Sequence, residues 1–221
     1  MPRYSRKTFR RRTRRKSPWY RRRYNAAELA YKAYKGVKYI RGLVNSEMLH
    51  ADKAYSNGSI GGSGTVAHIT ALSQGDTASG RTGNSILLRK INYRLKFEIN
   101  ASVTSNTSVT MVIFFDKQQI GDTTPTWTDV YDSANSWSLM SLATAGRFKI
   151  LQRKDITLTP ASGGRPAIEL KGNFNVYKHV RFNGTSGTDI QKNGLYVGFI
   201  SSEATNTPVV SGTVRIGYHD N

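Results

Sequence analysis

The chain has 221 residues, and its 33 Lys and Arg against 14 Asp and Glu give a formal net charge of +19. It contains no cysteine, which excludes disulfide frameworks, thiolate zinc sites, iron–sulfur clusters and cysteine nucleophiles. No apolar stretch approaches the roughly 18 residues that cross a bilayer, and no apolar segment follows the basic N-terminus. The sequence therefore predicts neither a membrane span nor a secretory signal.

The positive charge is concentrated at the start of the chain. Residues 1–41 contain 16 Lys or Arg and a single acid, whereas residues 42–221 contain 17 Lys or Arg and 13 acids. In residues 1–24, which we term the arginine-rich arm, twelve side chains are Arg or Lys and none is acidic. Like charges at this density repel, and few apolar side chains offset the entropy of ordering, so the arm is predicted to be disordered.

Residues 25–45 have the pattern of a basic amphipathic helix. Asn25 can cap the helix, with Glu28 three positions later as in a capping box. An apolar stripe recurs every three or four residues, and cations lie on the opposite side; the stripe is Leu29, Ala33, Val37, Ile40 and Val44, and the cations are Lys32, Lys35, Lys38 and Arg41. Gly36 weakens the helix by about 1 kcal/mol relative to Ala, so we expect full helix formation only on binding.

Residues 46–221 consist of short β-rich runs separated by turn residues, which predicts one all-β domain. Strands are expected at 47–54, 65–73, 85–99, 108–116, 147–159, 167–182, 194–203 and 210–219. In 85–99 the side chains expected to share the core face are Leu87, Ile91, Tyr93, Leu95, Phe97 and Ile99. About eight strands with turn-rich connections indicate an antiparallel sandwich or barrel. The long connection 117–146 contains short helical patterns and is expected to be functional or to pack against a neighbour.

The sequence contains no catalytic constellation. The four histidines (His50, His68, His179 and His219) lack the spacing of a metal site, and we expect them to be polar residues on half-exposed strands. Serine-hydrolase, zinc-protease and phosphate-loop motifs are absent from the sequence. Helix capping and turn formation account for the closely spaced aspartates. We therefore predict no enzyme activity, no cofactor and no metal within a subunit, and leave open a divalent cation between subunits.

The composition of the arm indicates nucleic-acid binding. Arginine offers a planar fork to phosphate and stacks on bases, and interspersed aromatics stack on bases regardless of sequence. Because a disordered arm has no fixed geometry, binding should tolerate any base sequence. The run RRRTRRK also fits a nuclear import signal. The predicted nucleic-acid-binding residues are Arg3, Arg6, Lys7, Arg10, Arg11, Arg12, Arg14, Arg15, Lys16, Trp19, Tyr20, Arg21, Arg22, Arg23, Lys32, Lys35, Lys38 and Arg41.

One segment carries a family resemblance. Residues 71–86 read ALSQGDTASGRTGNSI, and this Q-G-D…R-x-G-N-x-I pattern joins two predicted strands. It resembles capsid proteins of Rep-encoding circular single-stranded DNA viruses, in particular the group similar to satellite tobacco necrosis virus coats. The opening MPRYSRKTFRRRTRRK is similar to circovirus-like capsid N-termini. The resemblance covers nearly the whole chain in architecture, but only residues 71–86 match as a motif.

The resemblance implies a viral jelly roll of two four-stranded sheets, assembled as sixty copies into a T=1 shell with the arms inside. Such a protein would reside in the virion, after assembly in the host nucleus. Sixty copies of residues 1–41 would bring about 900 positive charges, the order needed for a genome of one or two kilobases. Trp127, Tyr131 and Trp137 are candidate interface anchors, with burial beneath their own loop as the alternative. Some related coats bind calcium through clustered aspartates, and no such cluster matches here.

Two other interpretations fit parts of the sequence. One is a cellular nucleic-acid-binding protein of ribosomal or chromatin type with a basic tail, although residues 42–221 carry a net charge of only +4. The other is a membrane-active peptide fused to a carrier, in which the amphipathic helix lies on anionic lipid. The charge pattern suits DNA and RNA equally, and only the resemblance favours circular single-stranded DNA.

Overall fold

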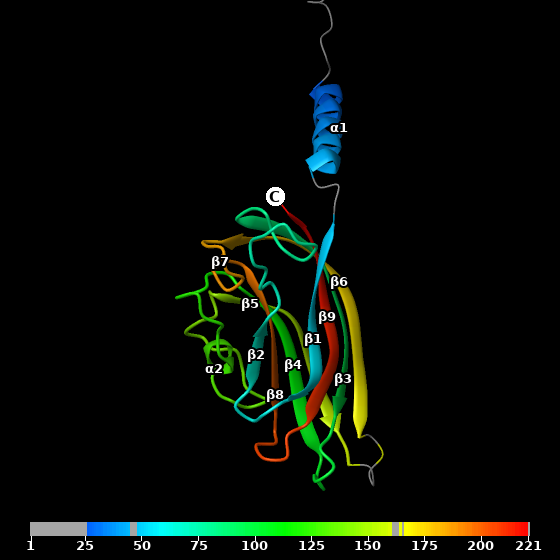
Figure 1. Cartoon of the computed structure of the whole chain (residues 1–221), viewed down its shortest axis with the longest axis vertical. Helices are drawn as coiled ribbons and strands as arrows, with labels where there is room; N and C mark the ends of the chain where they lie inside the picture. Colours follow the sequence, from blue (N-terminus) through cyan, green and yellow to red (C-terminus); the bar gives the residue numbers. More distant parts are fainter. Residues whose placement is uncertain (1–25, 45–47, 161–163, 165, 221) are drawn as a thin grey trace, which may run out of the picture. The chain divides into compact units, whose positions relative to one another are not determined.

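The computed structural model describes residues 26–44, 48–160, 164 and 166–220. The arginine-rich arm lies outside this part of the chain. Two compact units, Met1–Val44 and Asn45–Asn221, divide the molecule, and each is described by itself. The first contains the helix α1 (Ala26–Val44), within the range predicted for it, and the second contains the β domain (Figure 1). Neither helix of the described residues has the length and apolarity of a membrane span.

The β domain is built from two antiparallel sheets. Sheet A has the order β1-β9-β3-β6-β7, and sheet B has the order β2-β8-β4-β5. The chain crosses repeatedly between the two sheets, as in a jelly roll, so the predicted all-β fold is confirmed. The strands are β1 (Leu49–Ser59), β2 (Thr65–His68), β3 (Ser85–Glu98), β4 (Thr107–Asp116), β5 (Phe148–Leu158), β6 (Ala167–Phe182), β7 (Ile190–Lys192), β8 (Gly194–Ser201) and β9 (Val209–Asp220).

Sheet A has five strands rather than the four implied by the resemblance. The additional strand β7 is three residues long and pairs with Arg181 and Phe182 at the end of β6. A run this short leaves no periodic signal in the sequence. Two other boundaries also differ from the prediction: β1 continues to Ser59 across a bulge after Tyr55, and the second strand already ends at His68.

The main core lies between the two sheets, and β3 supplies its centre with alternating buried side chains. The predicted core face of β3 holds from Ile91 to Phe97, but it changes near the start of the strand. There, Ile86 and Leu88 are fully buried and Leu87 is only half-buried. The register with both neighbouring strands shifts between Leu88 and Lys90, and an irregularity of this kind moves the following side chains to the opposite face.

Sheet B is covered on its outer face as well. The connection 117–147, which includes the short helix α2 (Trp127–Val130), packs there in a second apolar cluster with side chains of β4, β5 and β8. Every residue of β8 is buried, and so is nearly all of β4. A bidentate ion pair closes the connection: Asp116 is fully buried, and its carboxylate accepts from Arg147 at 2.9 and 2.6 Å. The segment SLMSLATAG, expected to be helical, forms turns.

Candidate functional site

The predicted nucleic-acid-binding residues from Arg3 to Arg23 lie outside the described residues, and their role stays a prediction. In α1, Lys32, Lys35 and Lys38 are exposed, and Arg41 continues the helical backbone. Glu28 forms an ion pair with Lys32 at 3.0 Å one turn later. The ammonium group of Lys35 lies 4.8 Å from the centre of the Tyr31 ring.

The apolar stripe of α1 is exposed within this unit. Leu29, Val37 and Ile40 are each about half exposed, at 52%, 50% and 58%. At 100° per residue they lie within about 80° of one another, with Lys35 and Lys38 on the opposite side of the helix and Lys32 at the border of the stripe. α1 therefore has both exposed cations and an exposed apolar stripe.

Two of the three candidate interface aromatics belong to the core. Trp127 is 3% exposed and Tyr131 is 2% exposed, and their rings stack 4.7 Å apart on the outer face of sheet B. Glycines leave room for the indole: a Cβ at Gly64 would come within 2.7 Å of Trp127, and one at Gly198 within 3.3 Å. The alternative weighed from the sequence, burial beneath their own loop, therefore describes both side chains, and neither can act as a surface anchor in this fold.

The third aromatic belongs to an exposed apolar group, which we term the apolar loop patch: Trp137, Leu139 and Leu142. These side chains are 69%, 76% and 89% exposed. Sequence reasoning named Trp137 but missed the two leucines. The available signal was four large apolar residues within SWSLMSL, in a connection that is otherwise rich in polar residues. Clustered apolar exposure marks protein–protein contact surfaces.

The backbone beneath the apolar loop patch is held firmly. The guanidinium of Arg153 donates to the carbonyl oxygens of Ser136 and Ser138 at 2.6 and 3.0 Å. The Thr110 hydroxyl donates to the same Ser136 oxygen at 3.0 Å, and the amide of Ser141 donates to the carbonyl of Val130 at 3.0 Å. An anchored loop loses little conformational entropy when it binds, which suits an interface.

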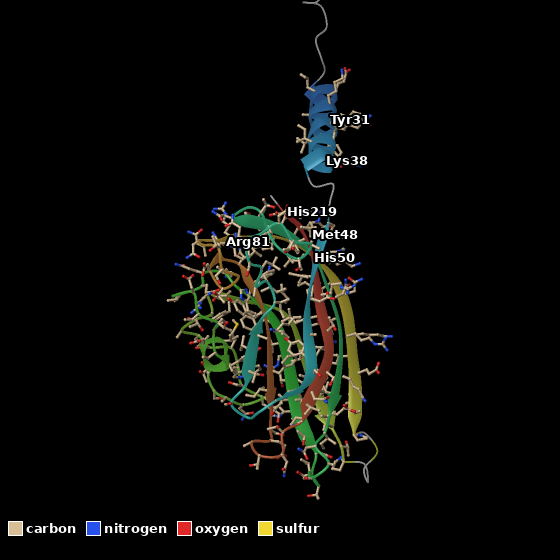
Figure 2. The ribbon with its side chains drawn as sticks, viewed as in Figure 1. Tyr31, Lys38, Met48, His50, Arg81 and His219 are labelled. Atoms are coloured by element: carbon tan, nitrogen blue, oxygen red, sulfur yellow. The ribbon has the colours of Figure 1, made fainter. Side chains whose placement is uncertain are left out.

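The segment that carries the family resemblance is organised around a buried arginine. Arg81 is fully buried, and its guanidinium lies 3.9 Å from the centre of the Phe182 ring (Figure 2). Burial lowers the pKa of Arg81 from its ordinary value, and the carboxylates of Asp189 and Asp220 oppose that change. The side chain stays charged, since arginine is not deprotonated in proteins.

The hydrogen bonds of Arg81 join two loops that are distant in sequence. Nε donates to the carbonyl of Leu72 at 2.9 Å and Nη1 to that of Gly83 at 2.7 Å. Nη2 donates to the carbonyl oxygens of Gly184 and Ser186, in the loop after β6. The motif therefore fixes the fold of the loops at this end of the domain.

The histidines do not form a metal site. Among the described residues, no three His, Asp or Glu side chains come together in a way that could hold a metal ion. His50 and His179 are exposed, as expected for polar residues on strands. His68 stacks on Tyr196, with ring centres 4.6 Å apart, and its Nε2 lies 3.1 Å from the Thr70 hydroxyl.

A family model for the satellite tobacco necrosis virus coat protein matches residues 34–221. The chain belongs to this family of viral coat proteins. The expectation of a virion coat protein is thereby confirmed, and the family points to a structural role. No curated protein matches the sequence.

Solved viral structures show distant likeness to the β domain. The structure of infectious bursal disease virus Gx strain is 8% identical with a TM-score of 0.34, and the VP2 subviral particle of infectious bursal disease virus is 10% identical with 0.35. Both are matched over 79% of this chain and 34% of theirs. Cucumber Leaf Spot Virus is 9% identical with a TM-score of 0.31, over 79% of this chain and 56% of that one. The chain thus spans about a third of the first two structures.

Proposed function

We propose that this coat protein assembles as sixty copies into a T=1 shell and packages a circular single-stranded DNA genome through residues 1–41. The observation that carries the proposal is the segregation of charge: 16 of the 33 Lys and Arg, and one of the 14 acids, lie in these 41 residues. Such a segment neutralises polyanion by displacing counterions, while a nearly balanced β domain can contact its own copies without strong repulsion.

The apolar loop patch is the proposed contact between copies. Its three side chains are large, exposed and close in sequence, and the loop that bears them is hydrogen-bonded in place. Interfaces concentrate their binding free energy in a few such anchors. The proposal needs no cofactor within a subunit, and any divalent cation between subunits would be an addition to it.

The choice of genome and compartment rests on the resemblance of residues 71–86 and of the arm. That resemblance favours circular single-stranded DNA, and the run RRRTRRK fits import into the host nucleus before assembly. Import and packaging are compatible because the arm is free before assembly and bound to genome afterwards.

Electron microscopy of the full-length chain, purified from cells that also replicate a circular single-stranded DNA, tests the proposal. Closed particles of uniform size are expected, with contents that resist nuclease until the shell is opened and that DNase then degrades. A chain that stays a monomer or small oligomer on size-exclusion chromatography would contradict the shell and favour a cellular nucleic-acid-binding protein. Particles that protect only RNA would contradict the DNA genome alone.

A further inference from the structure

The outer face of sheet A is divided into two electrostatically different parts. Over the middle of the sheet three cations are paired with acids, and Lys171, opposite Arg94, is the exception. Arg215 forms two bonds of 2.7 Å with Asp52, Arg94 lies 3.4 Å from Glu169, and Lys96 lies 2.6 Å from Glu98. This part of the surface is close to neutral.

The other part lies at the end of sheet A where β1 begins, which we term the Leu49 end (Figure 1). β3 begins and β6 and β9 finish there, as the pairing of Leu49 with Tyr218 and of Ser85 with Arg181 shows. Four cations on the outer side gather at this end, and none of them forms an ion pair with a described residue. We term them the cationic patch: Arg89, Lys90, Arg181 and Lys192.

An exposed aromatic side chain accompanies these cations. Tyr177 on β6 is 68% exposed, and the guanidinium of Arg89 lies 4.7 Å from the centre of its ring. Single-stranded nucleic acids are bound where cations follow the backbone and an aromatic face stacks on a base. The arrangement of an open ring beside unpaired charge suits that ligand.

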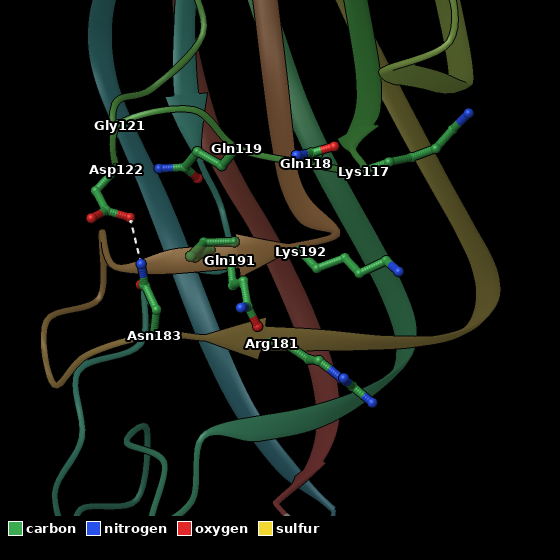
Figure 3. A pocket seen from close by; sticks show the side chains of 10 residues that line it. Lys117, Gln118, Gln119, Gly121, Asp122, Arg181, Asn183, Gln191 and Lys192 are labelled. Carbon is green, nitrogen blue, oxygen red and sulfur yellow. Dashed lines mark hydrogen bonds between the residues drawn. The ribbon is translucent and has the colours of Figure 1, made fainter.

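A cavity of about 470 Å³ adjoins the patch (Figure 3). Its lining combines the cations Lys117, Arg181 and Lys192 with the side-chain amides of Gln118, Gln119, Asn183 and Gln191. One acid also lines it, Asp122, which accepts a hydrogen bond from Asn183 at 3.2 Å. The amide of Gln119 is bonded to Thr188 and Tyr196. The amides of Gln118 and Gln191 can both donate to and accept from the polar edge of a base, and the cations suit a phosphate.

We propose that the cationic patch and this cavity form a second contact site for single-stranded nucleic acid, on the folded domain itself. Phosphates contact Arg181, Lys192 and Lys117, a base enters the cavity, and Tyr177 stacks on another base. The site rests on the proposed function, in which residues 1–41 hold the nucleic acid. The first strand of the β domain follows these residues in the chain and begins at Leu49. A strand held by residues 1–41 is therefore tethered near the Leu49 end at a high effective concentration.

Oligonucleotide binding by the full-length double variant Arg181→Gln/Lys192→Gln tests the site. The matched control is Lys149→Gln/Lys154→Gln, which removes two exposed cations of β5 that likewise make no ion pair with a described residue. The affinity for labelled oligothymidine is measured against salt. Each lost phosphate contact should lower the slope of log K against log salt by about 0.7 and the affinity about fivefold at about 0.1 M salt. The control should match the wild type.

Stacking is tested separately at Tyr177. Tyr177→Leu should weaken oligothymidine binding severalfold with an unchanged salt slope, and Tyr177→Phe should retain the affinity because the ring remains. Equal affinities of the two variants would overturn the stacking contact.

The outcomes separate this site from the shell itself. A double variant that binds oligothymidine like its control overturns the site. The same holds if the double variant loses only its binding to heparin, a polyanion without bases, and keeps its binding to oligothymidine. Electron microscopy of the same proteins reports independently on assembly. Particles formed by the double variant would agree with the proposed function even if the site is overturned. A wild-type protein that forms no particles would contradict the proposed function.

Discussion

The guanidinium of Arg81 satisfies carbonyl oxygens from two loops at once, at a fully buried position. Lysine keeps the charge but has one nitrogen and no planar fork, so it would leave several buried carbonyls without donors. We expect Arg81→Lys to lower the free energy of unfolding by about 3 kcal/mol. Urea unfolding followed by tryptophan fluorescence measures the change.

Arg94→Lys is the matched control for this substitution. Arg94 is 80% exposed in its side chain and lies 3.4 Å from Glu169, and exposed pairs of this kind contribute roughly 0–1 kcal/mol. The control should unfold close to the wild type. Equal midpoints for Arg81→Lys and Arg94→Lys would show that the buried hydrogen bonds do not stabilise the loops.

His68 makes the stability of the β domain depend on pH. Burial, with the charge of Lys53 as a second cause, lowers the pKa of His68 to about 4. Between pH 6.5 and 4 the unfolded chain binds a proton at this ring that the folded chain does not. The contribution of the neutral His68 ring to the free energy of unfolding is therefore fully present above pH 6.5. It is lost as the pH falls to 4, by up to about 3 kcal/mol.

His68→Gln removes this titration. The difference in unfolding free energy between wild type and variant should shrink as the pH falls from 6.5 to 4, and should be constant above pH 6.5. Subtracting the unfolding free energy of the variant from that of the wild type cancels the contributions of carboxylates that titrate in both proteins. A constant difference over the whole range would assign the acid sensitivity to other groups.

The connection 117–147 serves two purposes for sheet B. Its inner side chains, such as Trp127, bury the outer face of the sheet, and its outer ones form the apolar loop patch. Because Trp137 and Leu142 are exposed, Trp137→Ser/Leu142→Ser should change the unfolding free energy of the subunit by less than about 1 kcal/mol. The same double variant should strongly reduce the yield of particles, because interface anchors carry much of the association free energy.

Particle yield by electron microscopy and subunit stability by urea unfolding are the two measurements. Ile120→Ser is the control, because Ile120 is 63% exposed but lies outside the patch. Normal particles from the double variant would place the contact between copies elsewhere.

The strands were predictable where periodicity was long, and less so where a local irregularity or a distant segment decided the structure. Alternation along β6 indicated its more buried face except at Lys178, which is exposed between the buried Val176 and Val180. The register shift near Arg89 reversed the expectation for Leu87, since no residue type marks a bulge of this kind. Continuous apolar runs in β4 and β8 fit burial on both faces, but only the tertiary structure shows which connection covers them.

For the candidate site, composition located the charge but not the contacts. Lys32, Lys35 and Lys38 are exposed on α1, but so is every other side chain described there, so exposure alone does not mark a binding side. Arg81 was visible as part of a motif, yet its acceptor Gly184 is 103 positions away, which spacing alone does not reveal. The cationic patch was missed because its members come from three strands that are adjacent only in the folded sheet.

Taken as a whole, the molecule separates a strongly cationic leading segment from a β domain of nearly balanced charge. Deleting residues 1–24 should leave the β domain folded, because its described strands lie between Leu49 and Asp220. If about ten arm charges contact single-stranded phosphates, the deletion should reduce the salt slope of log K by roughly 7. Oligonucleotide titration at several salt concentrations gives the slope.

A full-length variant with the arm arginines replaced by glutamine is the control for chain length. It should lose affinity as the deletion does, since charge rather than length attracts the polyanion. A deletion that leaves both the affinity and the slope unchanged would mean that the arm does not bind nucleic acid.

The pairing of Leu49 with Tyr218 brings the first and last strands of the β domain side by side, running in opposite directions. A reporter fused beyond β9 would consequently emerge beside the root of the leader and share whatever compartment the leader occupies. The turn between β8 and β9 opens at the far end of the sandwich, so an epitope grafted there would be displayed at the end of the β domain opposite Leu49.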